Sequence, residues 1–149
     1  MEDERVTKKI GFLYWSDRTL FTRKISPHAI GPSQAAFLTL LSAGDPMRQD
    51  ELVSMSGVDK AIGTRVVRKL MEAGYIRRMR NPADHRAYLL SLTAEGARMK
   101  QIILEVYDSI NESLFQGFTD EERDMACNLL DRMIENLRRI PEPCVEKPK

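Results

Sequence analysis

The 149-residue sequence predicts a mainly α-helical fold that carries one small β-hairpin. Three observations support this class. Over most of the chain, apolar residues recur at spacings of three and four, the period of an amphipathic helix. Near residue 57, a glycine turn joins two short helical segments. Between residues 75 and 93, the pattern changes to alternation around a turn-rich centre, which is typical of two paired strands. With 42% hydrophobic residues, the chain can bury a core of its own.

The N-terminal part is predicted to form three helices. The first covers about residues 4–24 and ends ahead of Pro27, because proline disfavours helix in the residue before it. The second begins near Pro32, a favoured first-turn position, and ends by Gly44. The third covers about residues 49–55, and the two acids in its first turn suit the positive end of the helix dipole.

A basic helix follows after a turn of about three residues around Gly57. Its predicted apolar stripe contains Ile62, Val66 and Leu70, which recur every four residues, with Val67 and Ala73 beside them. Gly74 stands where a left-handed cap would end the helix. The opposite side carries Lys60, Ala61, Thr64, Arg65 and Arg68. Two short helices joined through a glycine turn, the second basic near its start, form the helix-turn-helix pattern.

Positive charge is concentrated in this basic helix and in the hairpin behind it. The hairpin is predicted from strands at residues 75–80 and 88–92 around a turn at 81–86. From Lys60 to Arg86, eight Lys or Arg residues oppose two acids, a net charge of +6, whereas the whole chain carries only +1. Such concentration is the electrostatic footprint of a phosphate-binding surface. On charge alone, a solvated charged helix is the alternative.

The C-terminal part is predicted to contain two long helices. Thr93 is the expected N-cap of the first, and Thr119 to Glu122 form a capping box that opens the second. We therefore expect a lobe at residues 30–93, dimerisation helices at 4–29 and 94–140, and a disordered tail at 141–149. The end helices carry apolar seams that the central lobe is too small to cover, which predicts a homodimer. A compact monomer with these helices folded back is the alternative.

Several classes of function are disfavoured by the sequence. There is no run of eighteen apolar residues and no apolar signal segment, so we expect a cytoplasmic protein without membrane contact. Two cysteines and two histidines at unhelpful spacing predict no metal site and no cofactor. No nucleophile–base pair or glycine-rich phosphate loop suggests an enzyme. Cys127 is expected to be a packed thiol, with a redox switch as the alternative, and Cys144 lies in the proline-rich tail.

The chain resembles the MarR family of winged helix-turn-helix regulators, most clearly from Ile30 to Thr93. The carrying segments are Gln34; Gln49, Glu51 and Leu52; Asp59-Lys60, Thr64-Arg65 and Leu70; Gly74-Tyr75-Ile76-Arg77-Arg78; Asn81-Pro82-Ala83-Asp84-His85-Arg86-Ala87; and Leu92-Thr93-Ala94-Glu95-Gly96. Three positions depart from the family. Arg48 replaces the usual Ser/Thr cap of the third helix, Asn81 replaces the first Asp of the wing, and Gly63 replaces an apolar residue. Gly63 either permits close approach to a neighbouring helix or to DNA, or simply weakens its helix.

The resemblance implies a sequence-specific regulator of transcription, a repressor that binds a palindromic operator in double-stranded DNA as a homodimer. The start of the basic helix would enter the major groove, and the wing would reach the minor groove. Asp84 would hold the guanidinium of Arg86 in place; a structural ion pair without a DNA role is the alternative. The predicted DNA-binding residues are Lys60, Ala61, Thr64, Arg65, Arg68, Arg78, Asp84, His85 and Arg86.

Many MarR-like proteins bind small aromatic anions between the dimer helices and the DNA-binding lobe. Here, Trp15 would offer a stacking face and Arg18 a partner for a carboxylate, with Phe37 and Tyr107 as apolar wall. Ordinary interface packing is the alternative for all four. The alternative function is a protein-interaction module without a ligand response, which would need an apolar exposed face on the basic helix.

Overall fold

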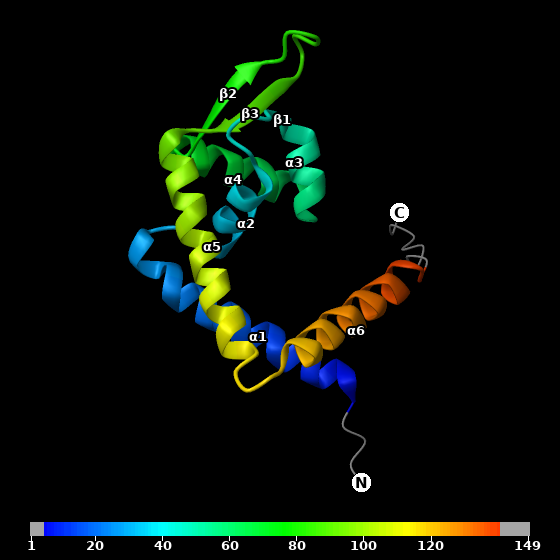
Figure 1. Ribbon diagram of the computed structural model, residues 1–149. Helices are drawn as coiled ribbons and strands as arrows, with labels where there is room; N and C mark the ends of the chain where they lie inside the picture. Colours follow the sequence, from blue (N-terminus) through cyan, green and yellow to red (C-terminus); the bar gives the residue numbers. More distant parts are fainter. Residues whose placement is uncertain (1–4, 141–149) are drawn as a thin grey trace. The chain divides into compact units, whose positions relative to one another are not determined.

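The computed structural model describes residues 5–140 and divides the chain into two units, residues 1–111 and 112–149. Figure 1 labels the elements. In order, they are α1 (Val6–Ile25), a 3-10 turn (Ser26–His28), α2 (Pro32–Leu40), β1 (Met47–Arg48), α3 (Gln49–Ser56), α4 (Lys60–Glu72), β2 (Ile76–Arg80), β3 (Tyr88–Leu92), α5 (Ala94–Leu114) and α6 (Asp120–Arg138). The predicted class, mainly α with a small β wing, is confirmed.

Helix α4 begins and ends as its sequence predicts. The Asp59 carboxylate accepts a hydrogen bond from the Ala61 N–H at 2.8 Å and caps the start, and Gly74 follows the end with a φ of 76°. The predicted apolar stripe is wrong at two positions, however, because both Ile62 and Ala73 are exposed. Ile62 is 49% exposed, and Gly63 is buried in its place, beside Val66, Val67 and Leu70. The missing side chain of Gly63 lets α3 approach on that side.

The sheet has three strands, in the order β1–β3–β2, and both pairs are antiparallel. Strands β2 and β3 form the predicted hairpin, in which Arg78 lies opposite Leu90. The sequence did not indicate β1, because two residues are too short to show an alternating pattern. In β1, Arg48 pairs with Leu89. This strand joins the start of α3 to the hairpin through backbone hydrogen bonds.

One core lies between the helices and the sheet of the first unit. Its fully buried members come from almost every element, among them Phe37, Leu38, Leu52, Leu70, Leu90 and Ile103. Helix α2 stops at Leu40, earlier than the limit that Gly44 sets, because Leu41 turns to an extended conformation and is itself buried. The ammonium of Lys100 donates to the Leu41 carbonyl at 2.6 Å and satisfies this end of the helix.

The start of α5 is fastened to the base of the hairpin. The Thr93 hydroxyl accepts from the Gly96 N–H at 3.0 Å, the predicted cap, and donates to the Gly74 carbonyl at 2.6 Å. Gly96 packs directly against the main chain of Tyr75, the residue before β2. A Cβ on Gly96 would lie 1.9 Å from the Tyr75 carbonyl oxygen. Only glycine fits at this contact.

In the second unit, the predicted capping box at the start of α6 is confirmed. The Glu122 N–H donates to the Thr119 hydroxyl at 3.2 Å, and the Glu122 carboxylate accepts from the Thr119 N–H at 2.9 Å. Cys127 is exposed within one chain, contrary to the expected packed thiol. Cys144 and the predicted disordered tail lie outside the described residues. Along the described part of the chain, no helix is both long and apolar enough to cross a membrane.

Candidate DNA-binding interface

The outward side of α4 is polar and cationic. Lys60, Ala61, Thr64, Arg65 and Arg68 are all exposed, as predicted, while the opposite side is buried in the core. The Thr64 hydroxyl donates to the Lys60 carbonyl at 2.8 Å, and the Arg68 guanidinium lies 3.7 Å from the Glu72 carboxylate, one turn further on. The first two turns of the helix therefore present donors to solvent on a rigid support.

The turn of the wing is shaped by two side chains that bind the main chain. The Asn81 side-chain oxygen accepts from the Ala83 N–H at 2.9 Å, and the Asp84 carboxylate accepts from the Arg86 N–H at 3.0 Å. Asparagine is therefore an adequate replacement for the family's first Asp, because the carbonyl oxygen of its amide supplies the same acceptor.

The predicted contact between Asp84 and the Arg86 guanidinium is wrong, and so is the alternative of an ion pair between them. One Asp84 oxygen binds the Arg86 main chain, and the other lies 3.9 Å from Nη1 of Arg48. A carboxylate whose two oxygens face a main-chain N–H and a different arginine leaves the exposed Arg86 side chain outside the pair. His85 is exposed beside them in the same turn.

The arginines of β2 have different surroundings. The Nε of Arg77 donates to the hydroxyl of Ser91 at 3.1 Å, and Ser91 is buried. The guanidinium of Arg78 lies over the Tyr88 ring, 4.1 Å from its centroid, a cation–π contact that fixes its direction. The alternation along β2 thus assigns Arg78, and not Arg77, to the surface shared with α4.

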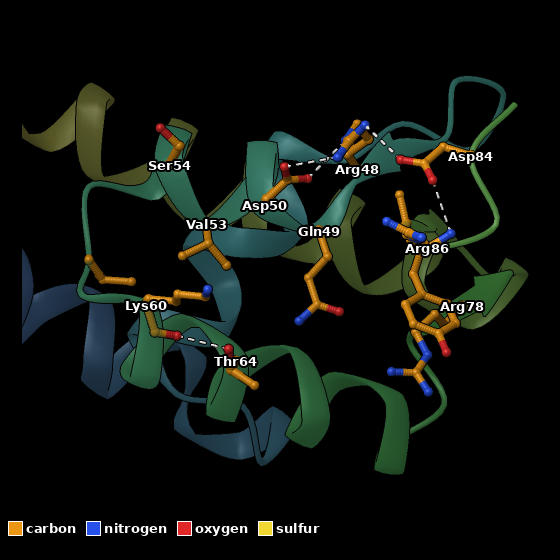
Figure 2. Close-up of a pocket in the computed structure, with 13 residues that line it drawn as sticks. Arg48, Gln49, Asp50, Val53, Ser54, Lys60, Thr64, Arg78, Asp84 and Arg86 are labelled. Carbon is orange, nitrogen blue, oxygen red and sulfur yellow. Dashed lines mark hydrogen bonds and ion pairs between the residues drawn. The ribbon is translucent and has the colours of Figure 1, made fainter. Parts of the chain in front are cut away.

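A concave surface of about 740 Å³ unites these elements, and Figure 2 shows the side chains that line it. Five of the predicted DNA-binding residues contribute: Lys60, Thr64, Arg78, Asp84 and Arg86. Ala61, Arg65, Arg68 and His85 are exposed outside this lining. Arg48 and Gln49, at the start of α3, line the cavity and were not among the predicted site residues. The replacement of the family's Ser/Thr cap by Arg48 is the sequence signal that could have indicated it.

Arg48 is the best-connected cation in this surface. Its Nε and Nη2 donate to the two carboxylate oxygens of Asp50 at 3.0 and 3.2 Å, a bidentate pair. This hydrogen bonding, followed by the attraction between the charges, raises the pKa of Arg48. The hydrogen bond from Arg48 likewise lowers the pKa of Asp50. Both groups therefore stay charged across the physiological range.

A second, smaller cavity of about 250 Å³ lies among α1, α2 and α5. It brings together three of the four predicted ligand residues, Arg18, Phe37 and Tyr107. The fourth, Trp15, does not line this cavity; it lines a separate groove and is 67% exposed. Phe21 provides the aromatic face instead, stacked on Tyr107 with ring centroids 4.7 Å apart.

The acidic side chain of Asp17 also lines this second cavity, a residue that the sequence reasoning did not include. Burial, and then the charge of Asp17, raise the pKa of the Tyr107 hydroxyl, which stays protonated at neutral pH. The cavity is thus lined by one acid, Asp17, one base, Arg18, and two phenols, Tyr14 and Tyr107. In the described part of the chain, no three His, Cys, Asp or Glu side chains are grouped so that they could hold a metal ion.

A helix-turn-helix with a cationic outer face and a basic β-wing beside it defines a winged-helix DNA-binding protein. The sequence model of the MarR family matches residues 30–88. The crystal structure of a MarR transcriptional regulator from Methanosarcina mazei Go1 is 31% identical, covers 95% of this chain and 94% of its own, and superposes with a TM-score of 0.81. The chain belongs to the MarR family, whose members are DNA-binding transcriptional regulators and not enzymes.

Two further relatives describe the range of the similarity. The HTH-type transcriptional repressor YetL of Bacillus subtilis is 32% identical over 88 residues, 58% of this chain and 52% of its own length. A mutant MarR from E. coli, complexed with operator DNA, shares the fold with a TM-score of 0.76, at 23% identity, over 86% of this chain and 92% of its own.

Proposed function

We propose that this MarR-family protein is a repressor that binds a palindromic operator as a homodimer in the cytoplasm. The observation that carries the proposal is the division of α4 into two sides. The side with Gly63, Val66, Val67 and Leu70 is buried, and the side with Lys60, Thr64, Arg65 and Arg68 is exposed next to the basic wing. A rigid cationic helix of this kind fits the major groove, which is about 12 Å wide.

The position of each side chain along α4 suggests its contact with DNA. Lys60, Thr64 and Arg65 belong to the first two turns and would reach base edges and adjacent phosphates, with Ala61 against a thymine methyl group. Arg68 is one turn further on and would meet phosphate. The N-terminal turns of a recognition helix are those that contact bases in known helix-turn-helix complexes.

The wing would contact the neighbouring minor groove. Arg86 and His85 are exposed at its turn, and Arg78 is held over Tyr88 on the same side as the concave surface. An arginine inserted in the minor groove reads groove width and negative potential. Asp84 would act through the wing's conformation, because its oxygens contact protein groups.

Binding of a palindrome requires two copies of the DNA-binding lobe to be held together. Exposed apolar faces of the end helices suggest how the two copies pair. Residues of α1 such as Val6, Ile10 and Leu13 are about half exposed, and so is the apolar side of α6, which includes Met125, Leu129, Leu130, Met133, Ile134 and Leu137. Apolar faces of this extent on a monomer usually mark an interface. We infer that the residue 30–93 lobe binds DNA and that α1, α5 and α6 pair with those of a second copy.

The test selects bound sequences from a random duplex pool and measures the mass of the complex in solution. The proposal predicts an inverted repeat with half-sites one helical turn apart, about 34 Å, bound by two chains. A single half-site bound by one chain would contradict the dimer while leaving the DNA contacts intact. Replacing Leu130 and Met133 by Glu is expected to give monomers with weaker DNA binding.

Repression is the proposed direction of regulation, by analogy with YetL, a named repressor. A dimer that covers an operator excludes polymerase from an overlapping promoter by occupancy alone. Transcription in vitro from a promoter carrying the selected sequence should fall as protein is added. A rise in transcript would reverse the assignment.

The proposal also includes release from DNA by a small aromatic ligand. The 250 Å³ cavity beside Phe21, Phe37 and Tyr107 supports it, since its aromatic walls suit a single ring and Arg18 suits an anionic group. The carboxylate of Asp17, which lines the same cavity, would repel an anionic group. Calorimetric titration with benzoate is the test, and absence of heat at millimolar benzoate would favour ordinary packing.

The alternative, a winged-helix module that binds another protein without a ligand response, needs an apolar outer face on α4. Among the cations of α4, the exposed apolar side chains are the small Ala61 and one large residue, Ile62. Binding to duplex DNA that weakens as salt rises would exclude this alternative, because phosphate neutralisation releases counterions.

A further inference from the structure

Arg48 occupies the junction between the wing and the helix-turn-helix. It is the second residue of β1, where it pairs with Leu89 of β3, and the residue immediately before α3. Its own side chain makes no capping bond to α3. The guanidinium instead extends in two directions, as Figure 2 shows: toward Asp50 in the first turn of α3, and toward Asp84 in the wing.

The two contacts of Arg48 differ in strength. The bidentate pair with Asp50 uses Nε and Nη2 at 3.0 and 3.2 Å and sets the direction of the planar guanidinium. The third nitrogen, Nη1, then lies 3.9 Å from the outer oxygen of Asp84. Asp50 thus anchors Arg48, and the anchored Arg48 offers its remaining nitrogen to the wing.

Asp84 links this contact to the turn that carries Arg86. Its other oxygen accepts the main-chain N–H of Arg86 at 3.0 Å. The chain of contacts from α3 to the wing is therefore Asp50, Arg48, Asp84 and the Arg86 backbone. The positive partner of Asp84 is therefore Arg48, and Asp84 binds Arg86 through its main chain.

We propose that Arg48 is a positioning residue. It holds the wing at a fixed distance from α3 and from α4, the recognition helix that packs on α3, and keeps the Arg86 side chain available for the minor groove. The proposal rests on the function proposed above, in which Arg86 contacts DNA. It assigns Arg48 a role through Asp84 and not a direct contact with DNA. The competing role is that Arg48, an exposed cation in the same concave surface, binds a phosphate itself.

The test compares three single variants, and the double variant R48Q/D84N, on the best duplex that the wild-type protein selects from a random pool. R48Q removes the charged link. D84N removes the charge of the partner and keeps an oxygen that can accept the Arg86 N–H. R98Q is the matched control, because it deletes one positive charge on α5, where Arg98 pairs with Glu95 outside the concave surface.

The expected changes are modest, because exposed ion pairs are weak. R48Q should lower affinity about two- to fivefold for each wing that engages DNA, D84N should do about the same, and the double variant should be no weaker than either alone. R98Q should bind as the wild type does. Additive losses in the double variant, or an R48Q affinity equal to that of wild type, would overturn the proposal.

Dimethyl sulfate distinguishes positioning from direct phosphate binding. It methylates guanine N7 in the major groove and adenine N3 in the minor groove, so one reagent reports both grooves. In R48Q, protection of adenine N3 under the wing should weaken, and protection of guanine N7 under α4 should persist. An equal loss in both grooves would identify Arg48 as a general phosphate contact.

Hydrogen exchange of the protein without DNA provides a second readout that a phosphate contact would not change. Amides at residues 81–88 should exchange faster in R48Q than in wild type or R98Q, because the turn loses its link to α3. Unchanged exchange would contradict a positioning role. R86A separates the two proposals: if R86A binds normally, the wing contact itself fails; if R86A weakens binding and R48Q does not, only the role of Arg48 fails.

Discussion

Gly63 of α4 lies against Val53 of α3 so closely that a Cβ on the glycine would stand 2.6 Å from one Val53 methyl carbon and 2.8 Å from the other. The glycine therefore sets the separation of the two helices of the helix-turn-helix. Of the two roles that the sequence left open for Gly63, close approach to a neighbouring helix is confirmed. The cost of glycine within a helix, about 1 kcal/mol relative to alanine, is offset by this packing.

Gly63→Ala should test this contact. Alanine adds helix propensity but forces Val53 aside, and overpacking costs about 1–3 kcal/mol. We expect a net loss of stability of about 1 kcal/mol in urea unfolding and weaker operator binding, since α4 is displaced. Shortening the opposing residue, as in Gly63→Ala with Val53→Ala, should restore binding relative to Val53→Ala alone. A Gly63→Ala protein more stable than wild type would show that α3 yields freely.

Gly96→Ala should be far more damaging. The added Cβ would meet the Tyr75 carbonyl oxygen, which belongs to the backbone and cannot rotate away. We expect a loss of more than about 3 kcal/mol, seen as a large fall in the midpoint of thermal unfolding or as failure to fold. An unfolding midpoint close to that of wild type would refute the close approach of α5 to the hairpin.

Arg65→Ala tests the contact assigned to the recognition helix. If Arg65 reaches a base, operator affinity should fall by about 1–3 kcal/mol and discrimination should relax at one base pair of each half-site. Arg68→Ala, the assigned phosphate contact, should weaken specific and nonspecific duplexes to a similar extent. Gel-shift titration on both duplexes measures the difference, and an unchanged affinity would remove Arg65 from the interface.

Arg86→Ala tests the wing. Loss of a phosphate-neutralising cation should flatten the dependence of affinity on salt by about 0.9 in log–log slope for each engaged wing. Titrations at several potassium chloride concentrations measure the slope, with Arg98→Ala as the comparison. The same slope in both variants and in wild type would place Arg86 away from the duplex.

The pKa of Asp50 should report its pair with Arg48. The hydrogen bond from Arg48 lowers the pKa of Asp50 in the folded state. The Asp50 carboxylate therefore stabilises the fold at pH values above its unfolded-state pKa, and this stabilisation is lost as pH falls through its folded-state pKa. In Arg48→Gln, the Asp50 pKa should return toward 3.8, and the acid-side loss of stability should shrink. NMR titration of the side-chain carboxyl gives the value directly, and an unshifted pKa would contradict the pair.

The cationic side of α4 could be predicted from the sequence, because periodicity places residues around a helix whatever its neighbours are. Asp59, Thr93 and Thr119 were likewise predictable, since a cap depends on residues nearby in the chain. The buried side of α4 was predicted less well: Ile62 and Ala73 are exposed, and Gly63 is buried. Ile62 fits a helical stripe better than Gly63 does, and only the closeness of Val53 reverses the choice.

Contacts between segments that are distant in the chain could not be predicted from the sequence. The ion pair of Arg48 with Asp84 joins residues that the chain separates by two complete helices, α3 and α4, and by strand β2. Strand β1 is too short to show an alternating pattern. Asp84 and Arg86 are near neighbours in sequence, which made their pairing the obvious expectation. The separation of Trp15 from Phe37 and Tyr107 depends on which side of α1 faces the core, and α1 has aromatic residues on more than one side.

The fastening of α5 to the hairpin has a mechanical consequence. The Thr93 hydroxyl binds the Gly74 carbonyl, and Gly96 packs against Tyr75. These two contacts connect the start of α5 rigidly to the hairpin. A rotation of α5 further along the helix would therefore be transmitted directly to the wing.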